Sequence, residues 1–398
     1  MRALPLMSLV LVTGCGVQFT PETLVDSLRV LSVTAEPPEV APGELATMSV
    51  LFGDPTRVGQ PTTVIWVGCE PDPLDLNRSA CNDASFLIKP TLITDYPPGL
   101  KLLGFSRQAA YAASPGVFDV LPADDLIRTN GSIGQVIAIV IAEAVDVSAM
   151  GDEVKQVFQR IEDKVTPAAI AITRVVVSEK AQKNHNPQID NLTFDGAPLP
   201  LGGRLQVKAG QKVSLGVDVP ESSREHYTEV QPSGPVEKQE KVVGAWYSSG
   251  GRFSQERFDV VDTAPTIFTA PGSAEFPEDP VPEKRSGQLW LVVRDNRGAQ
   301  AFQQFRYFVC DESLATPRVT GLTVSTSETE PVVVTGQNMD KVLDIVIGGV
   351  ALTNGTYSAS RGAFVGFLSG LAPGIPYPVT MRGQNCSSVD TGLTYTVP

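Results

Sequence analysis

The side chains that most often carry hydrolytic catalysis are scarce in this sequence. Only two histidines occur, His185 and His226, and both lie in polar stretches where we expect them to be solvated. The sequence contains no G-x-S-x-G nucleophile elbow, no H-E-x-x-H zinc helix and no phosphate-binding P-loop. These observations argue against a histidine-based triad and a zinc hydrolase. We therefore predict a protein that is not an enzyme and needs no cofactor or metal.

Carboxylates are plentiful, and they leave an acid-dependent glycosidase open as an alternative. The neighbouring pairs Asp124 with Asp125 and Glu278 with Asp279 are typical of solvated loop acids on an acidic surface. One group of acids could offer oxygen ligands to calcium. Its members are Asp259, Asp262, Glu275, Glu278 and Asp279. Their spacing matches no calcium motif, so we favour no metal site there.

Three tryptophans, Trp66, Trp246 and Trp290, could either stack on sugars or fill a core. Each lies in a predicted strand, and β-sandwiches commonly bury a tryptophan, so we expect all three inside. Asp295 and Gly298 flank a short turn. Turn geometry alone accounts for both residue types.

The composition describes a folded, acidic protein. Apolar residues make up 42% and charged residues 19% of the 398 residues, and the formal net charge is −13. Lysine and arginine are scattered, which argues against a nucleic-acid partner and against binding of anionic lipid through a basic patch.

The amino-terminal residues predict export. Arg2 precedes the apolar run Ala3–Val12, which is too short to span a bilayer as a helix but fits the apolar region of a signal peptide. Small residues then lead to Cys15. An ordinary secretory signal with an incidental cysteine is one explanation of this pattern.

The tetrapeptide Val12-Thr13-Gly14-Cys15 resembles a bacterial lipobox. In that family the cysteine is acylated on sulfur, released by cleavage before it, and acylated again on its new amino group. The resemblance implies a signal peptide over 1–14, lipid such as palmitate on Cys15, a lipidated tether over 15–26, and the membrane as a partner through that lipid. Gly16, where many inner-membrane lipoproteins have aspartate, implies the outer membrane, on either its periplasmic or its surface face.

The remaining cysteines predict two disulfides. If Cys15 carries lipid, four cysteines remain, and an even number in an exported protein suggests pairing. Cys69 and Cys81 share one loop and form the natural local pair, which leaves Cys310 with Cys386. The absence of CxxC spacing makes a zinc site the weaker explanation.

Short runs with period-2 apolar alternation predict a first β domain over 27–182. We expect strands at 28–33, 45–52, 62–67, 116–120, 133–144 and 169–178, with an edge segment at the proline-rich 36–44. Apolar residues at helical spacing predict one inserted short helix over Gly151–Lys164. We expect a long loop over Pro90–Ala113, where any special site would be built.

Two further domains follow at 187–310 and 316–398. The first has a V-x-A-G turn at Val207–Gly210, a strand with Trp246 and a terminal D-x-x-G hairpin, and it resembles bacterial immunoglobulin-like and PKD-like domains. The second contains Val332–Met339 and Asp344–Val350, which resemble the IPT/TIG immunoglobulin-like family. The resemblances imply an all-β protein of tandem immunoglobulin-like antiparallel β-sandwiches, with a short hinge at Asp311–Pro317.

Two functional interpretations remain. We favour a lipid-anchored, non-catalytic stalk in the cell envelope, acting in adhesion, scaffolding or surface assembly, with an envelope protein as its partner. The alternative is an accessory lipoprotein that binds polysaccharide, or a carboxylate-dependent glycosidase. An exposed row of aromatic residues or a cleft with paired carboxylates in the first domain would favour the alternative.

Overall fold

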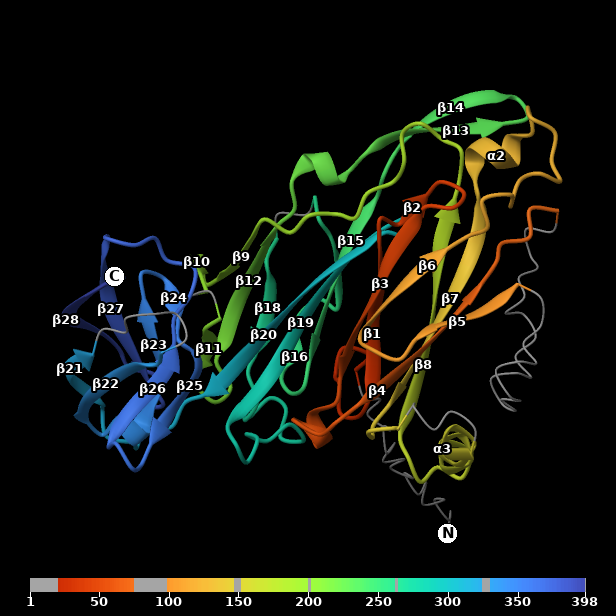
Figure 1. Ribbon diagram of the computed structural model, residues 1–398. Helices are drawn as coiled ribbons and strands as arrows, with labels where there is room; N and C mark the ends of the chain where they lie inside the picture. The colour runs from red at the N-terminus through yellow and green to blue at the C-terminus, as the bar shows by residue number, and fades with distance from the viewer. Residues whose placement is uncertain are drawn as a thin grey trace, which may run out of the picture.

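The chain folds into three β-sandwiches, which Figure 1 shows from right to left in chain order. The computed structural model describes residues 21–74, 99–146, 152–199, 202–261, 264–323 and 330–397. Strands make up nearly all of the regular structure in these residues, and only two short α-helices interrupt them. The predicted all-β class of tandem sandwiches is therefore confirmed.

The first sandwich has a three-stranded sheet with the order β1-β3-β6 and a five-stranded sheet with the order β2-β8-β7-β4-β5. Its strands are β1 (Arg29–Glu36), β2 (Glu39–Val40), β3 (Leu45–Gly53), β4 (Thr63–Cys69), β5 (Leu100–Gly104), β6 (Gln108–Ala112), β7 (Ser132–Ile141) and β8 (Ala168–Val177). The helix α2 (Leu126–Asn130) precedes β7, and α3 (Asp152–Glu162) lies between β7 and β8.

The chain changes sheet at the proline-rich stretch after β1. β1 pairs antiparallel with β3, whereas β2 pairs in parallel with the end of β8. Pro37 and Pro38 have no backbone N–H, so this stretch cannot continue a central strand. The predicted edge segment is confirmed. The parallel pairing departs from the fully antiparallel arrangement that we expected, because β2 keeps the direction of β1 while it joins the opposite sheet.

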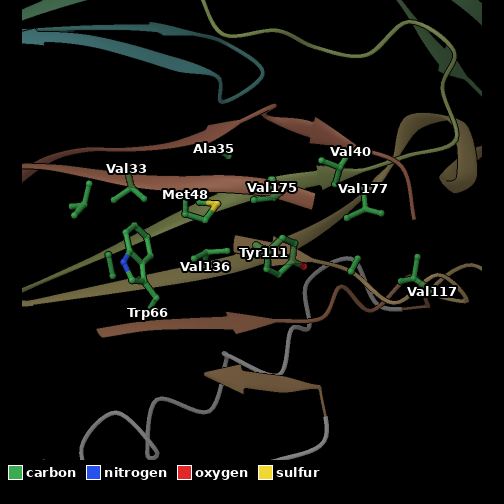
Figure 2. Close-up of a cluster of buried hydrophobic side chains, with 14 of the residues drawn as sticks. Val33, Ala35, Val40, Met48, Trp66, Tyr111, Val117, Val136, Val175 and Val177 are labelled. Carbon is green, nitrogen blue, oxygen red and sulfur yellow. The ribbon is translucent and has the colours of Figure 1, made fainter. Parts of the chain in front are cut away.

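The core of the first sandwich lies between its two sheets. Trp66, Met48 and Tyr111 are buried there, and Figure 2 shows them pointing into the same space from different strands. The Trp66 indole N–H donates to the Ser106 carbonyl at 2.7 Å, and the Tyr111 hydroxyl donates to the Cys69 carbonyl at 3.1 Å. These bonds satisfy the polar atoms that burial removes from water.

The second sandwich repeats this arrangement. Its sheets have the orders β10-β9-β12-β18-β16 and β11-β20-β19-β15-β17, and β11 again joins the last strand, β20, in parallel. Its strands are β9 (Asn191–Phe194), β10 (Ala197–Pro198), β11 (Arg204–Val207), β12 (Lys212–Asp218), β15 (Val242–Ser248), β16 (Arg252–Phe253), β17 (Arg257–Asp259), β18 (Thr266–Thr269), β19 (Ser286–Asp295) and β20 (Gln300–Val309). A separate hairpin of β13 (His226–Gln231) and β14 (Gly234–Gln239) extends towards α2 (Figure 1).

The third sandwich has two four-stranded sheets, β21-β22-β26-β25 and β24-β23-β27-β28. Its strands are β21 (Arg318–Thr323), β22 (Val332–Gln337), β23 (Val342–Ile347), β24 (Val350–Ala351), β25 (Thr353–Ser358), β26 (Ala363–Phe367), β27 (Pro376–Gly383) and β28 (Ser388–Thr396). Its core is separate from the cores of the other two sandwiches.

Two predicted features of the first domain are wrong. The expected strand at 116–120 is a series of turns, in which Asp119 N–H donates to the Gly116 carbonyl, and its apolar residues Val117 and Phe118 reach the core from those turns. The described part of the expected loop at Pro90–Ala113 contains β5 and β6. These strands gave a weak signal because β6 is rich in alanine, which has low β propensity.

The predicted inserted helix is present as α3, but the sequence pattern missed α2. Five residues are too few to display a helical period. The Asp125 carboxylate caps α2 by accepting a hydrogen bond from the Ile127 N–H at 2.9 Å.

The tether predicted over 15–26 is wrong at its carboxyl-terminal end. Ser248 N–H donates to the Thr23 carbonyl at 2.9 Å, and Val25 N–H donates to the Ser248 carbonyl at 2.8 Å. Val25 is fully buried against the second sandwich. The segment before β1 is thus part of the folded structure from Thr23 onward.

Candidate functional site

The structure does not bring the two histidines together. His185 Nδ1 lies 2.7 Å from Glu225 Oε1, but the His185 side chain is 68% exposed. His226 is exposed at the start of β13. Both histidines are therefore solvated, as predicted.

Asp124 and Glu278 are exposed, as predicted for loop acids, whereas their neighbours Asp125 and Asp279 are half-buried and have structural roles. Asp125 caps α2, Glu278 pairs with Arg252 at 2.9 Å, and Asp279 accepts a hydrogen bond from the Gly251 N–H at 2.6 Å. Burial raises the pKa of the Asp279 carboxyl.

The acids considered for calcium are directed to different partners. Glu275 pairs with Lys212 at 2.9 Å, Glu278 pairs with Arg252, and Asp262 lies outside the described residues. Within the described ranges, no three residues of the types His, Cys, Asp or Glu are grouped so that they could hold a metal ion.

The three tryptophans are buried, as predicted. Trp66 and Trp290 are 0% exposed and Trp246 is 1% exposed. Trp66 and Trp246 fill the cores of their own sandwiches, whereas Trp290 packs at the junction between the first two sandwiches. None of them can act as an exposed platform for a sugar.

The turn at Asp295 also behaves as predicted. Asp295 Oδ1 accepts hydrogen bonds from the N–H groups of Arg297, Gly298 and Ala299 at 2.9, 2.6 and 2.8 Å. Asp295 Oδ2 accepts a further bond from Asn184 in the segment between the first two sandwiches. This second role leads to the feature that the sequence analysis missed, the junctions between the sandwiches.

The first junction has an apolar centre. The outer face of the β1-β3-β6 sheet packs against the outer face of the sheet that contains β15 and β19. Leu31 and Leu51 from the first sandwich meet Trp290 and Val292 from the second, and all four are at most 5% exposed. Because contact between the two sandwiches removes these apolar side chains from water, it favours a fixed arrangement of the sandwiches.

Side chains of the second sandwich and of the segment before it also cover the free edge of β1. Arg294 donates to the Leu31 carbonyl at 2.5 Å, Gln300 donates to the Val33 carbonyl at 3.2 Å, and Asn186 donates to the Ala35 carbonyl at 2.7 Å. Alternate carbonyls of an edge strand point to one side, so three donors complete the edge that no neighbouring strand pairs.

A cluster of buried charged residues around Arg297 also lies at this junction. Arg297 forms ion pairs with both Glu225 and Glu240, and it donates to the Asn184 side chain at 2.7 Å. The Glu240 side chain is only 1% exposed. Burial raises the pKa of Glu240 to about 7, against the lowering effect of its hydrogen bond from Arg297.

The same network reaches the first sandwich through Asn184. Its backbone N–H donates to Glu39 Oε2 at 2.8 Å, and the other Glu39 oxygen accepts a bond from the Ser178 hydroxyl. Asn184 is 2% exposed although it lies in the predicted interdomain boundary. Asn184 thus ties this boundary to the first sandwich through Glu39 and to the second through Arg297 and Asp295.

The β13–β14 hairpin adds a second contact to the first sandwich. The Asn130 side chain at the end of α2 donates to the Val230 carbonyl at 2.7 Å and accepts from the Val230 N–H at 3.1 Å. A cavity of about 290 Å³ lies next to this contact. Asn130, Lys180, Tyr227 and Arg297 are among the residues that line it. Arg297 stacks over the Tyr227 ring at 4.5 Å.

The second junction contains the predicted disulfide. Cys310, at the end of the second sandwich, is bonded to Cys386 in the turn after β27. Asp311 N–H donates to the Gln384 carbonyl at 2.9 Å, and Asp311 pairs with Arg285 at 3.1 Å. The segment predicted as a hinge is therefore fixed at its start.

A buried ion pair supports this junction. Asp344 and Arg382 of the third sandwich are each 7% exposed and lie 3.4 Å apart. Arg382 also donates to the Gln206 side chain at 3.0 Å, and Asp344 accepts from the Arg204 N–H at 3.3 Å. Burial raises the pKa of Asp344 and lowers the pKa of Arg382.

The remaining predicted site residues fall largely outside the described residues. Cys15 and Cys81 both do, whereas Cys69 is fully buried and disulfide-bonded. The pairing of Cys69 with Cys81 stays a prediction, as does lipid on Cys15. None of the helices in the described ranges has the length and apolar character that a bilayer crossing requires.

Comparisons with known proteins do not identify a family for this chain. No family model matches the sequence, and no curated protein matches it. Among solved structures, a Bacteroides ovatus protein of a mixed-linkage glucan utilization locus, solved with a heptasaccharide, is 12% identical over 94% of this chain and 71% of its own, with a TM-score of 0.18. A Bacteroides thetaiotaomicron lipoprotein is 8% identical over 32% of this chain and 84% of its own, with a TM-score of 0.20. Such low scores establish neither a shared ligand nor a shared function.

Proposed function

We propose that this protein is a lipid-anchored, non-catalytic protein of the cell envelope whose sandwiches act together as a rigid scaffold in adhesion or surface assembly. The closure of both junctions carries the proposal. Junctions between flexibly linked domains expose polar linkers, whereas Asn184 and Cys310 are 2% and 5% exposed at these two. A rigid body holds its binding loops at fixed separations, which suits a scaffold.

The position of the anchor supports a scaffold close to the membrane. The six peptide links between Cys15 and Pro21 span at most about 20 Å. Thr23 and Val25 already belong to the folded structure. Lipid on Cys15 would therefore hold the first two sandwiches near the bilayer instead of at the end of a long stalk.

Polysaccharide binding is the weaker proposal. It predicts exposed aromatic residues, but the three tryptophans are buried. The described part of the segment where we expected a special site consists of β5 and β6 and their connections. An acid-dependent glycosidase is weaker still, because the neighbouring acids that we considered cap or pair locally.

The anchor is tested by replacing the acylated cysteine. In cells given labelled palmitate, we expect the parent to take up label and sediment with membranes, and the Cys15→Ser variant to do neither. Cys310→Ser combined with Cys386→Ser is the control, because it removes thiols without touching the lipobox. If Cys15→Ser remains in the membrane fraction to the same extent as the parent, the lipid-anchor proposal fails.

A further inference from the structure

One edge of the first sandwich, along β8, has unpaired backbone groups. β8 pairs with β7 along its whole length, but on its other side β2 pairs only with Val176 and Val177. Among the described residues, no strand therefore pairs with the segment 168–174 on that side, although the buried Thr173 hydroxyl donates to the Val33 carbonyl of β1 at 3.3 Å. This open segment begins directly after Pro167 and ends where β2 begins.

The direction of the backbone groups follows from the β2 pairing. Val176 N–H donates to the Pro38 carbonyl, so the N–H and C=O groups of Val176 point away from β7. In an antiparallel sheet these groups alternate sides, so those of Ile170 and Ile172 point the same way. Within the described residues, neither isoleucine makes a backbone hydrogen bond on that side.

This edge also exposes large apolar side chains. Ile170 is 55% exposed and Ile172 is 62% exposed. They continue two rows that cross the outer face of the five-stranded sheet, Ile65–Ile139–Ile170 and Val67–Ile137–Ile172. The members on β4 and β7 are at most 5% exposed, so each row passes from buried to exposed only at β8.

The edge lacks the usual protection against pairing. Natural edge strands carry lysine, proline or a bulge that prevents another strand from adding. Within the open segment the exposed Arg174 is the one charged residue, Pro167 lies just before it, and the pairing of β7 with β8 has no register shift, so the stretch Ala168–Thr173 between them has no such protection. By contrast, side chains of Arg294 and Gln300 from the second sandwich and of Asn186 from the segment before it cover the edge of β1.

We propose that β8 pairs antiparallel with β8 of a second copy of this chain, about a two-fold axis at Ala171. Ala171 is the midpoint of the open segment 168–174. This register places Ile170 opposite Ile172 of the second copy, so the apolar rows continue through the axis. Arg174 lies opposite Ala168 of the second copy, so no like charges meet despite the net charge of −13.

The same register satisfies the backbone. Ile170 and Ile172 would form the closely hydrogen-bonded pairs of an antiparallel ladder, and Ala171 would form the intervening pair without hydrogen bonds. A two-fold axis perpendicular to the sheet can stand along the membrane normal, which keeps both amino-terminal segments at one height above a single membrane. The pairing itself uses no part of the anchor, so it does not depend on lipid at Cys15.

Cysteine crosslinking tests the register in the full-length chain. Opposite residues of a pair without hydrogen bonds have Cα atoms about 4.5 Å apart, which a disulfide can bridge. Ala171→Cys should therefore give a reducible band at twice the monomer mass on a non-reducing gel. Ala169→Cys is the matched control on the same strand and face, because its Cα atoms would lie about 13 Å apart. Equal crosslinking of the two variants would overturn the proposed register.

A surface substitution tests the interface without added thiols. The detergent-solubilised parent should have the mass of a dimer by light scattering, and Ile172→Lys should shift it to the mass of a monomer. Val389→Lys, at a 39% exposed position on β28, should leave the dimer unchanged. A monomeric parent, or a dimer that Ile172→Lys does not weaken, would overturn the proposal. Neither result would bear on acylation of Cys15.

Discussion

At the scale of single residues, Arg297 and Glu240 make the stability of the first junction depend on pH. Arg297 lies between Glu225 and Glu240, and Asn184 links this cluster to Glu39 of the first sandwich. A carboxyl that is 1% exposed loses its hydration, and this loss disfavours the charged form. Protonation of Glu240 is thereby coupled to the packing of the two sandwiches.

We predict that Glu240 makes the free energy of unfolding decrease as the pH rises. Its pKa is about 7 in the folded protein and about 4.5 in the unfolded chain, so the folded state binds the proton more tightly. The stabilisation is complete below about pH 4.5 and is lost as the pH rises through 7. Glu240→Gln should therefore reduce the fall in Tm between pH 5 and pH 8. Glu237→Gln, at an exposed position on β14 just before Glu240, should show the same dependence of Tm on pH as the parent.

At the scale of elements, the free edges of β1 and β8 are covered to different extents. The edge of β1 is completed by donors from Arg294, Gln300 and Asn186, whereas β2 covers only the end of the β8 edge. Gln300 is central to the first arrangement. It donates to the Val33 carbonyl, and its side-chain oxygen accepts bonds from Ser32 at 2.9 Å and from Arg294 at 3.0 Å.

Gln300→Ala should loosen the contact between the first two sandwiches. The change leaves the Val33 carbonyl with fewer donors and leaves Ser32 and Arg294 without this acceptor. Loss of partners for buried polar groups costs about 1–3 kcal/mol. We expect an earlier first transition in thermal unfolding, followed by calorimetry. Gln304→Ala, at an exposed position on the same strand, should unfold like the parent. An unchanged first transition in Gln300→Ala would show that the apolar centre alone holds the junction.

At the scale of the whole molecule, each junction between sandwiches combines several kinds of contact, and these contacts support the proposed rigid scaffold. The first junction has an apolar centre, a completed strand edge and a buried ionic cluster. The second has a disulfide and the buried pair of Asp344 with Arg382. Removal of one partner from a buried ion pair typically costs 3–5 kcal/mol, so such pairs disfavour opening of the junction.

Removal of the disulfide should allow the third sandwich to move relative to the second. Cys310→Ser with Cys386→Ser opens a closed loop with a sequence separation of 76 residues, and we expect a loss of roughly 4 kcal/mol in unfolding free energy. Spin labels at the exposed positions Val120 and Ile375 should report one narrow distance distribution in the parent and a broader one in this variant. A distribution that is already broad in the parent would contradict the rigid scaffold.

The amino-acid sequence by itself determined the all-β class, most of the strands, the burial of the tryptophans and the turn at Asp295. These features depend on local patterns, namely period-2 alternation and residues that favour turns. The short helix α2 and the alanine-rich strand β6 gave no such pattern and were missed. Lipid on Cys15 is also a prediction from a local motif, and it awaits the experiment described above.

Only the tertiary structure decided how the sandwiches are joined. Asn184, Arg297 and Glu240 are far apart in sequence, and each resembles an ordinary solvated polar residue until the fold buries them together. The exposure of Ile170 and Ile172 has the same origin. Their alternation predicts a strand but does not say whether another strand will cover it. The physical reason is that burial and pairing are properties of surfaces that meet in space, and a local sequence pattern does not record which surfaces meet.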